Sequence, residues 1–180
     1  AMMLEFRPVS VSGTRLQTMT KHSKRLLVLA AVISVAVMGS MIKPTKVRAA
    51  DARQLSFYHT HTRRSISVVY YQNGEYVESA LDEINRFLKD FRTGEVTRIN
   101  PELLDLLHDV RNELGSDQVY EVISAYRSPK TNEMLRGRSK SSGVAKRSYH
   151  MQGKAIDIRL NGCDLKQLHK AALSLKAGGV

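Results

Sequence analysis

The sequence has little cysteine: Cys163 is the only one among 180 residues. A single cysteine excludes an internal disulfide framework of the kind that stabilises many small secreted domains. A catalytic thiol is not indicated either, because no residue near Cys163 in the sequence is identified as a base that would activate it. The fold must therefore depend on a hydrophobic core, and the chain is long enough for one domain with such a core.

Acidic residues are also scarce. The chain has 17 Asp and Glu against 28 Lys and Arg, which gives a formal net charge of +11. Residues 1–52 hold eight basic and two acidic residues, whereas residues 53–180 hold twenty and fifteen and carry only +5. A strongly basic chain suggests a nucleic-acid partner, but much of the excess charge here belongs to the N-terminal segment.

Residues 1–52 have the features of an N-terminal extension with a secretory signal peptide. The basic stretch Thr20–Arg25 precedes an apolar run with its core at residues 26–42, and Ala50-Asp51-Ala52 is an Ala-x-Ala cleavage site. Alternatively the run stays as an anchor, since it is nearly long enough to span a bilayer. Ser23–Leu27 also resembles a twin-arginine export signal with one arginine replaced by lysine. Both interpretations place the remaining chain in the periplasm, so no nucleic acid is expected as a partner, and a membrane only through an uncleaved leader.

Residues 53–180 alternate strand patterns with amphipathic helix patterns. Asn73-Gly74 predicts a tight hairpin turn, and Asn100-Pro101 predicts a helix start. This order of elements predicts an α+β domain, a small antiparallel sheet with helices packed on one side. The expected elements are a hairpin over 54–77, strands at 119–126 and 155–160, and helices at 79–92, 101–114 and 165–176.

A histidine and an aspartate, His150 and Asp157, lie seven residues apart with Gly153 between them. Residues 155–160 alternate apolar and polar, so Asp157 is expected inside a strand and His150 on the loop that leads into it. Gly153 allows that loop to fold back, because glycine has no Cβ. Both side chains are good zinc ligands. From the spacing alone, a surface histidine and a turn-capping aspartate remain an alternative.

The other histidines of residues 53–180 fit structural positions better. His59 and His61 are expected at solvated positions of the first strand, and His108 half-buried in a leucine-rich helix. His169 belongs to the last predicted helix. None of these four is expected to bind the metal.

The segment that contains His150 and Asp157 has the form Ser-x-His-x-x-Gly-x-Ala-x-Asp over residues 148–157. This pattern resembles the LAS-type zinc peptidases, which include D-Ala-D-Ala carboxypeptidases, dipeptidases and murein endopeptidases. Ile123–Ser128 upstream and Lys170–Val180 downstream are similar to the murein endopeptidase K branch of that family. The resemblance covers roughly residues 53–180.

The resemblance implies a LAS/hedgehog-type fold and one Zn²⁺ held by His150 and Asp157. It also implies that Arg127 and Ser148 contact the substrate, although a turn hydroxyl is an equal alternative for Ser148. In the family the third ligand is a histidine after a Gly-Gly-Val segment, and an acidic residue near it is the general base. Both are expected beyond Val180, so the catalytic domain at 53–180 is expected to be incomplete at its C-terminus and this chain inactive.

The function expected of the full-length protein is that of a monomeric, periplasmic zinc endopeptidase that cuts peptide cross-links of peptidoglycan and binds its stem peptides. Eight Lys and Arg against one acidic residue within 127–154 would attract such an anionic polymer. Two alternatives stay open. One is a D-Ala-D-Ala carboxypeptidase or dipeptidase of the same family, and the other is a non-catalytic, zinc-bearing module that binds the cell wall.

Overall fold

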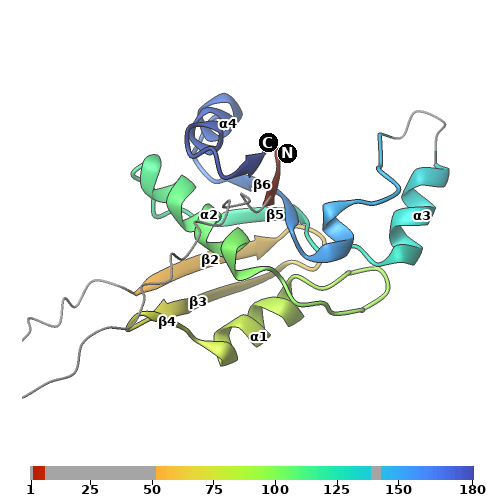
Figure 1. Ribbon diagram of the computed structural model, residues 1–180, viewed down its shortest axis with the longest axis horizontal. Helices are drawn as coiled ribbons and strands as arrows, with labels where there is room; N and C mark the ends of the chain where they lie inside the picture. Colours follow the sequence, from red (N-terminus) through yellow and green to blue (C-terminus); the bar gives the residue numbers. More distant parts are fainter. Residues whose placement is uncertain (1, 7–51, 139–142) are drawn as a thin grey trace, which may run out of the picture. The chain divides into compact units, whose positions relative to one another are not determined.

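The computed structural model describes residues 2–6, 52–138 and 143–180, and the predicted signal peptide lies outside these residues. The described strands form one seven-stranded sheet with the order β4-β3-β2-β5-β6-β1-β7 (Figure 1). Neighbouring strands are antiparallel except β2 and β5, which are parallel. The strands are β1 (Met2–Phe6), β2 (Arg53–His59), β3 (Arg64–Gln72), β4 (Glu75–Tyr76), β5 (Tyr120–Ser124), β6 (Ala155–Leu160) and β7 (Gly178–Gly179).

Side-chain caps set the start of three of the four described helices. The side chains of Asn100, Ser128 and Asp164 each accept a hydrogen bond from a backbone N–H of the first turn, and proline follows the first two caps. The helices are α1 (Glu78–Phe87), α2 (Pro101–Glu113), α3 (Pro129–Gly137) and α4 (Leu165–Ser174), with a short 3₁₀-helix η1 (Tyr149–Gln152). The cap at Asn100 confirms the sequence prediction and α4 begins at the predicted residue 165, whereas α1 ends earlier than the predicted 92.

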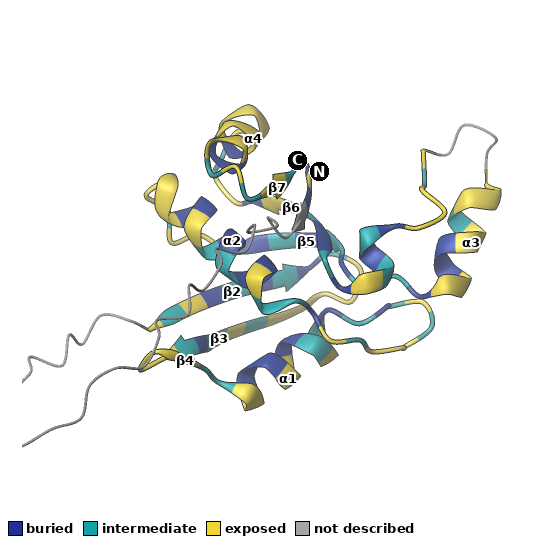
Figure 2. Ribbon diagram, in the orientation of Figure 1, coloured by how far each residue is buried: buried dark blue, intermediate teal, exposed yellow. Residues whose placement is uncertain are grey.

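The core lies on one face of the sheet, where α1, α2 and α4 pack. Inward-facing strand residues such as Phe57, Tyr120 and Ile158 are fully buried in the same cluster as Ile84, Leu104 and Leu168 of the helices (Figure 2). Burying a side chain of this size contributes roughly 1.5 to 3 kcal/mol. Polar side chains of β2 and β3, including Ser56 and Ser67, lie exposed on the other face. The predicted α+β class with helices on one side is confirmed; the parallel β2–β5 pair is an addition to the predicted antiparallel sheet.

Asp105 of α2 fastens that helix to the sheet edge. Its carboxylate accepts hydrogen bonds from Arg53 Nη1 at 2.7 Å, from the Tyr70 hydroxyl at 3.0 Å and from the Tyr76 hydroxyl at 2.5 Å. These donors come from β2, β3 and β4. One charged acceptor therefore connects α2 to three strands.

Strand β1 was not anticipated from the sequence. It pairs with β6 on one side, with Met3 opposite Asp157, and with β7 on the other. Met2 and Leu4 are buried in the core, while Met3 is 40% exposed on the opposite face. No helix within the described part of the chain has the length and hydrophobicity that a membrane span requires.

Candidate metal and substrate site

The four predicted site residues lie on neighbouring elements at one end of the sheet. Arg127 follows β5, Ser148 and His150 belong to the segment that forms η1, and Asp157 is in β6. Because Ile156 and Ile158 are buried in the core, the side chain of Asp157 lies on the opposite face of β6. His150 Nε2 approaches Asp157 Oδ2 to 3.6 Å. The structure thus brings the two predicted ligands together, as their spacing indicated.

The imidazole of His150 is buried and held in one orientation. Its Nδ1 lies 2.6 Å from the carbonyl oxygen of Ala125. A carbonyl can only accept a hydrogen bond, so Nδ1 carries the proton and the lone pair of the neutral ring is on Nε2, which faces Asp157. Metal-binding histidines typically have this arrangement, with the second ring nitrogen donating to a carbonyl or carboxylate.

Gly153 shapes the turn between η1 and β6. Its φ of +65° lies in the left-handed region, and a Cβ at this position would lie 2.3 Å from the backbone oxygen of Arg98. Its own carbonyl accepts a hydrogen bond from Asn100 N at 2.9 Å. No side chain fits here without movement of the backbone, so glycine sets the path that joins His150 to Asp157.

Arg127 lies beside both candidate ligands. Its backbone N–H donates to the carbonyl of His150 at 3.2 Å, and its Nη2 is 3.8 Å from Asp157 Oδ2. The side chain is only 11% exposed, and its buried Nε has no hydrogen-bond partner among the described residues. Burial lowers the pKa of Arg127, although the Asp157 carboxylate counters this effect. The guanidinium still carries its charge, because its pKa starts far above neutrality.

Ser148 occupies the turn position that the sequence left open as an alternative. Its side chain is buried, and its Oγ accepts a hydrogen bond from the backbone N–H of His150 at 3.3 Å. It therefore caps η1. This contact orders the loop that carries His150, and a substrate contact by Ser148 remains a prediction.

Asp90 supports the site, and the sequence analysis missed it. Its Oδ2 accepts from the backbone N–H of Ser128 at 2.9 Å and its Oδ1 from that of Arg92 at 2.9 Å. Burial alone would raise the pKa of the Asp90 carboxyl, but hydrogen bonds from Thr131, Ser128 and Arg92 lower it well below its usual range. Asp90 thereby fixes the start of α3 next to Arg127. It lies only three residues after α1, and no local pattern distinguished it from a solvated carboxylate.

These residues surround an open pocket of about 500 Å³ on the exposed face of β6. Met3 of β1 forms one wall, and the loop before η1 forms another. The lining residues are Met3, Arg127, Gly143, Val144, Ala145, Arg147, Ser148, Tyr149, His150 and Asp157. The pocket combines two potential metal donors, a half-buried guanidinium and a hydrophobic wall, which suits a peptide with a charged group.

The donor pair fits a zinc ion. Two protein atoms that hold one zinc tetrahedrally, each about 2.0 to 2.2 Å from it, lie about 3.4 Å apart, close to the 3.6 Å between His150 Nε2 and Asp157 Oδ2. Across residues 2–6, 52–138 and 143–180, however, no group of three His, Cys, Asp or Glu side chains is arranged to hold a metal. The described residues therefore supply two donors and no third.

The other histidines lie elsewhere, in part against expectation. His59 is fully buried, with its ring 5.5 Å from that of Phe91 and 6.0 Å from that of His61, so its predicted solvated position is wrong. Burial, and secondly the charge of His61, lowers the pKa of His59. His108 is half-buried, as predicted, and His169 is exposed on α4. The sequence missed the burial of His59 because the strand ends where aromatic residues after α1 cover it.

Comparison with known proteins decides the family. The model of the family described as peptidoglycan L,D-endopeptidase MepK matches residues 47–180. The chain belongs to this family. It is 37% identical over 163 residues to the peptidoglycan L,D-endopeptidase MepK of Escherichia coli (strain K12), with 88% of this chain and 86% of the relative covered. A probable peptidoglycan L,D-endopeptidase MepK of Haemophilus influenzae is 35% identical over 148 residues, which cover 79% and 78%.

Membership confirms the predicted family and its murein endopeptidase branch. The match begins at residue 47, close to the predicted start of the catalytic domain, and includes Arg127, Ser148, His150 and Asp157. No solved structure matched the chain.

Proposed function

We propose that this protein is a zinc-dependent peptidase that hydrolyses peptide cross-links of peptidoglycan in the periplasm, as an L,D-endopeptidase. The observation that carries the proposal is the convergence of His150 Nε2 and Asp157 Oδ2 at 3.6 Å in an open pocket, in a member of a family described as peptidoglycan L,D-endopeptidases. The fixed tautomer of His150 supports a ligand role, because the lone pair faces Asp157 before any metal binds.

In this proposal His150 and Asp157 are ligands of one Zn²⁺. When bound, a zinc ion supplies a Lewis acid for the scissile carbonyl and lowers the pKa of a water molecule. A catalytic zinc usually takes three protein ligands, so the third ligand and the general base remain predictions that the described residues do not supply.

Arg127 is proposed to bind a carboxylate of the substrate or the oxyanion that develops during hydrolysis. Its guanidinium lines the pocket beside both proposed ligands. A planar guanidinium can donate two parallel hydrogen bonds to a carboxylate. The 3.8 Å distance to Asp157 places this charge at the edge of the proposed metal site.

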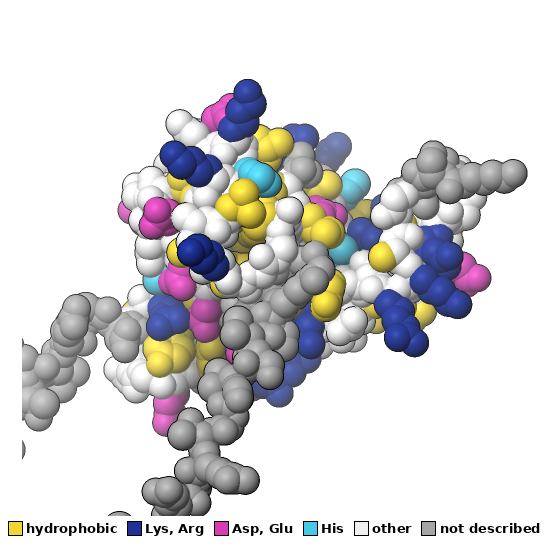
Figure 3. All heavy atoms as spheres, turned by 45° about the horizontal axis from the view of Figure 1, so that its top comes forward, with side chains coloured by type: hydrophobic (Ala, Val, Ile, Leu, Met, Phe, Trp, Pro, Cys, Tyr) yellow, Lys and Arg dark blue, Asp and Glu magenta, His cyan; other side chains and the backbone are white. Residues whose placement is uncertain are grey.

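Basic side chains beside the pocket are proposed to attract the anionic polymer. Lys and Arg gather at the side of the molecule that carries α3 (Figure 3). The exposed ones in this region include Lys130, Arg136, Arg138, Lys146 and Arg147. Charges of one sign next to a site raise the local concentration of an oppositely charged substrate, and peptidoglycan stem peptides carry free carboxylates.

Two measurements test the proposal. Zinc content, determined by atomic emission, should be lost or strongly reduced in His150→Ala and Asp157→Ala, whereas His169→Ala, which removes an exposed histidine, should match the wild type. Purified sacculi digested with the protein should release fragments whose mass identifies the cleaved bond. Release of free terminal D-Ala would instead indicate the carboxypeptidase alternative. Equal zinc content in wild type and His150→Ala would remove His150 from the metal site.

A further inference from the structure

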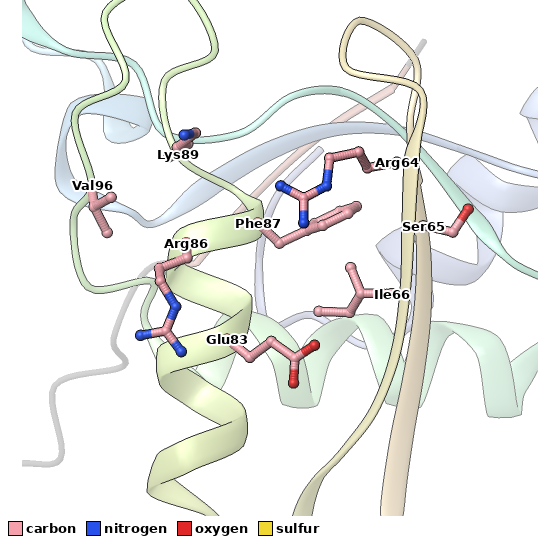
Figure 4. A pocket seen from close by; sticks show the side chains of 8 residues that line it. All are labelled: Arg64, Ser65, Ile66, Glu83, Arg86, Phe87, Lys89 and Val96. Atoms are coloured by element: carbon pink, nitrogen blue, oxygen red, sulfur yellow. The ribbon is translucent and has the colours of Figure 1, made fainter.

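A second pocket lies between α1 and β3. Its volume is about 360 Å³, and it shares no lining residue with the pocket at His150 and Asp157. Figure 4 shows the lining side chains, which come from β3 on one side and from α1 and the loop after it on the other. The lining residues are Arg64, Ser65, Ile66, Glu83, Arg86, Phe87, Lys89 and Val96.

Positive charge dominates this pocket. Its lining contains three cationic side chains, those of Arg64, Arg86 and Lys89, and one carboxylate, that of Glu83. Within the part of the chain that the structure describes, none of the three cations forms an ion pair; the ion pairs of Arg and Lys there involve Arg53, Arg98 and Arg127. The pocket thus concentrates cations whose charge is not neutralised at ion-pair distance by any carboxylate that the structure describes.

Strand register explains why the cationic Arg64 and the apolar Ile66 lie on the same face of the sheet. In the β2–β3 pair, Phe57 is opposite Ile66 and His59 is opposite Arg64. Paired residues point to the same face of a sheet, so Arg64 and Ile66 both lie on the face that α1 covers. In Figure 4, Arg64 extends from the strand over the ring of Phe87, while Ser65 points away from the pocket.

We propose that this pocket binds a carboxylate of a second peptidoglycan stem peptide, while a first stem peptide occupies the pocket at His150 and Asp157. The inference rests on the proposed function, which supplies a polymer with carboxylates on successive peptides. Two arginines offer planar donors that match a carboxylate, and Ile66 and Phe87 offer apolar contact to the adjoining side chain. Glu83 disfavours a doubly charged group such as a phosphate monoester, because it adds a like charge to the same pocket.

Two sites on one protein have a specific consequence for a polymeric substrate. Once one peptide is bound, the second contact forms at the high effective concentration that the polymer itself provides. The pocket therefore increases retention on intact sacculi and contributes nothing to the turnover of a small cross-linked fragment that fills only the first site.

The experiment compares two double variants that lose the same charge. Arg64→Gln/Arg86→Gln removes the two pocket arginines, and Lys166→Gln/Lys170→Gln removes two exposed lysines of α4 that line neither pocket. Binding to isolated sacculi is measured by co-sedimentation at low ionic strength, with EDTA present so that metal-dependent cleavage does not alter the polymer. The same measurement is repeated on sacculi whose carboxylates have been converted to amides. Thermal melting verifies that both variants are folded.

The pocket variant should bind native sacculi about fivefold more weakly than the lysine variant, since each exposed ion pair contributes a factor of this order or less. On amidated sacculi the difference should disappear. Equal binding by the two variants would refute the inference, as would a difference that persists after amidation. The proposed function fails separately: it is refuted if the metal-loaded protein releases no fragments from sacculi.

Discussion

Substitution of Gly153 by alanine measures how much the turn that joins the two proposed ligands contributes to stability and to metal binding. Gly153 has a φ of +65°, and an added Cβ would be 2.3 Å from the backbone oxygen of Arg98. That oxygen belongs to the main chain, so a side-chain rotation cannot relieve the contact. Either the loop before α2 or the turn after η1 must move, and the 2.9 Å hydrogen bond from Asn100 N to Gly153 O lies between them.

The cost has two parts. An alanine in the left-handed region is less stable than glycine by about 1 kcal/mol. Forcing an extra methyl group into a packed site typically costs about 1 to 3 kcal/mol more. The free energy of unfolding should therefore fall by about 2 to 4 kcal/mol. For a domain of this size that corresponds to a decrease in melting temperature of roughly 6 to 15 °C.

Gly162 provides the control, because its φ of +71° is similar but no atom of the described residues lies within 4 Å of an added Cβ. Gly162→Ala should cost only the conformational part, about 1 kcal/mol. Thermal melts of both variants give the steric part of the cost as the difference between their losses of stability. Zinc content should fall in Gly153→Ala and stay unchanged in Gly162→Ala, since the displaced turn carries His150. Equal melting temperatures for the two variants would show that the contact with Arg98 does not constrain the turn.

Three further predictions follow. Arg127→Lys should lower kcat/KM roughly tenfold, about 1.4 kcal/mol, with zinc content unchanged; full activity would show that the planar fork is not needed. Burial favours neutral His59 in the folded chain, so the free energy of unfolding should be greatest above about pH 6.5 and fall as the pH decreases below it. Melting temperatures at about pH 7.5 and pH 5 should differ less in His59→Phe, and an equal loss would contradict this. Asp105→Ala should lower the free energy of unfolding by about 2 to 3 kcal/mol, because Arg53 and two tyrosine hydroxyls lose their acceptor; exposed Asp109→Ala should change it by less than about 0.5 kcal/mol in urea denaturation.

Local signals predicted much of the fold and the central pair of the site. Asn100-Pro101 began a helix as expected, and Asn73 and Gly74 both have the positive φ that their turn type requires. The convergence of His150 and Asp157 followed from strand alternation plus a glycine in between. The same cap-and-proline signal is present at Ser128-Pro129 and begins α3, so that helix could have been predicted.

Long-range contacts were not predictable from one sequence. Strand β1 pairs with β6 across more than 150 residues of chain, and nothing in Met2–Phe6 identifies its partner. The parallel pairing of β2 with β5 has the same cause, since a strand pattern does not specify its neighbour or direction. Burial of His59 depends on Phe91, which lies beyond the end of α1. Each of these features arises from tertiary packing and not from local periodicity.

The arrangement of the site also explains which substitutions should disturb it. His150 is held by main-chain groups: its ring by the carbonyl of Ala125, and its own carbonyl by the backbone N–H of Arg127. Such contacts do not depend on the identity of the side chain at 125, so they should survive most substitutions there. Three supports do depend on identity: Gly153 through the space that it leaves, Asp90 through its carboxylate, and Ser148 through the hydroxyl that accepts from the backbone N–H of η1. A loss of metal affinity without loss of either ligand should therefore map to these three positions before any others.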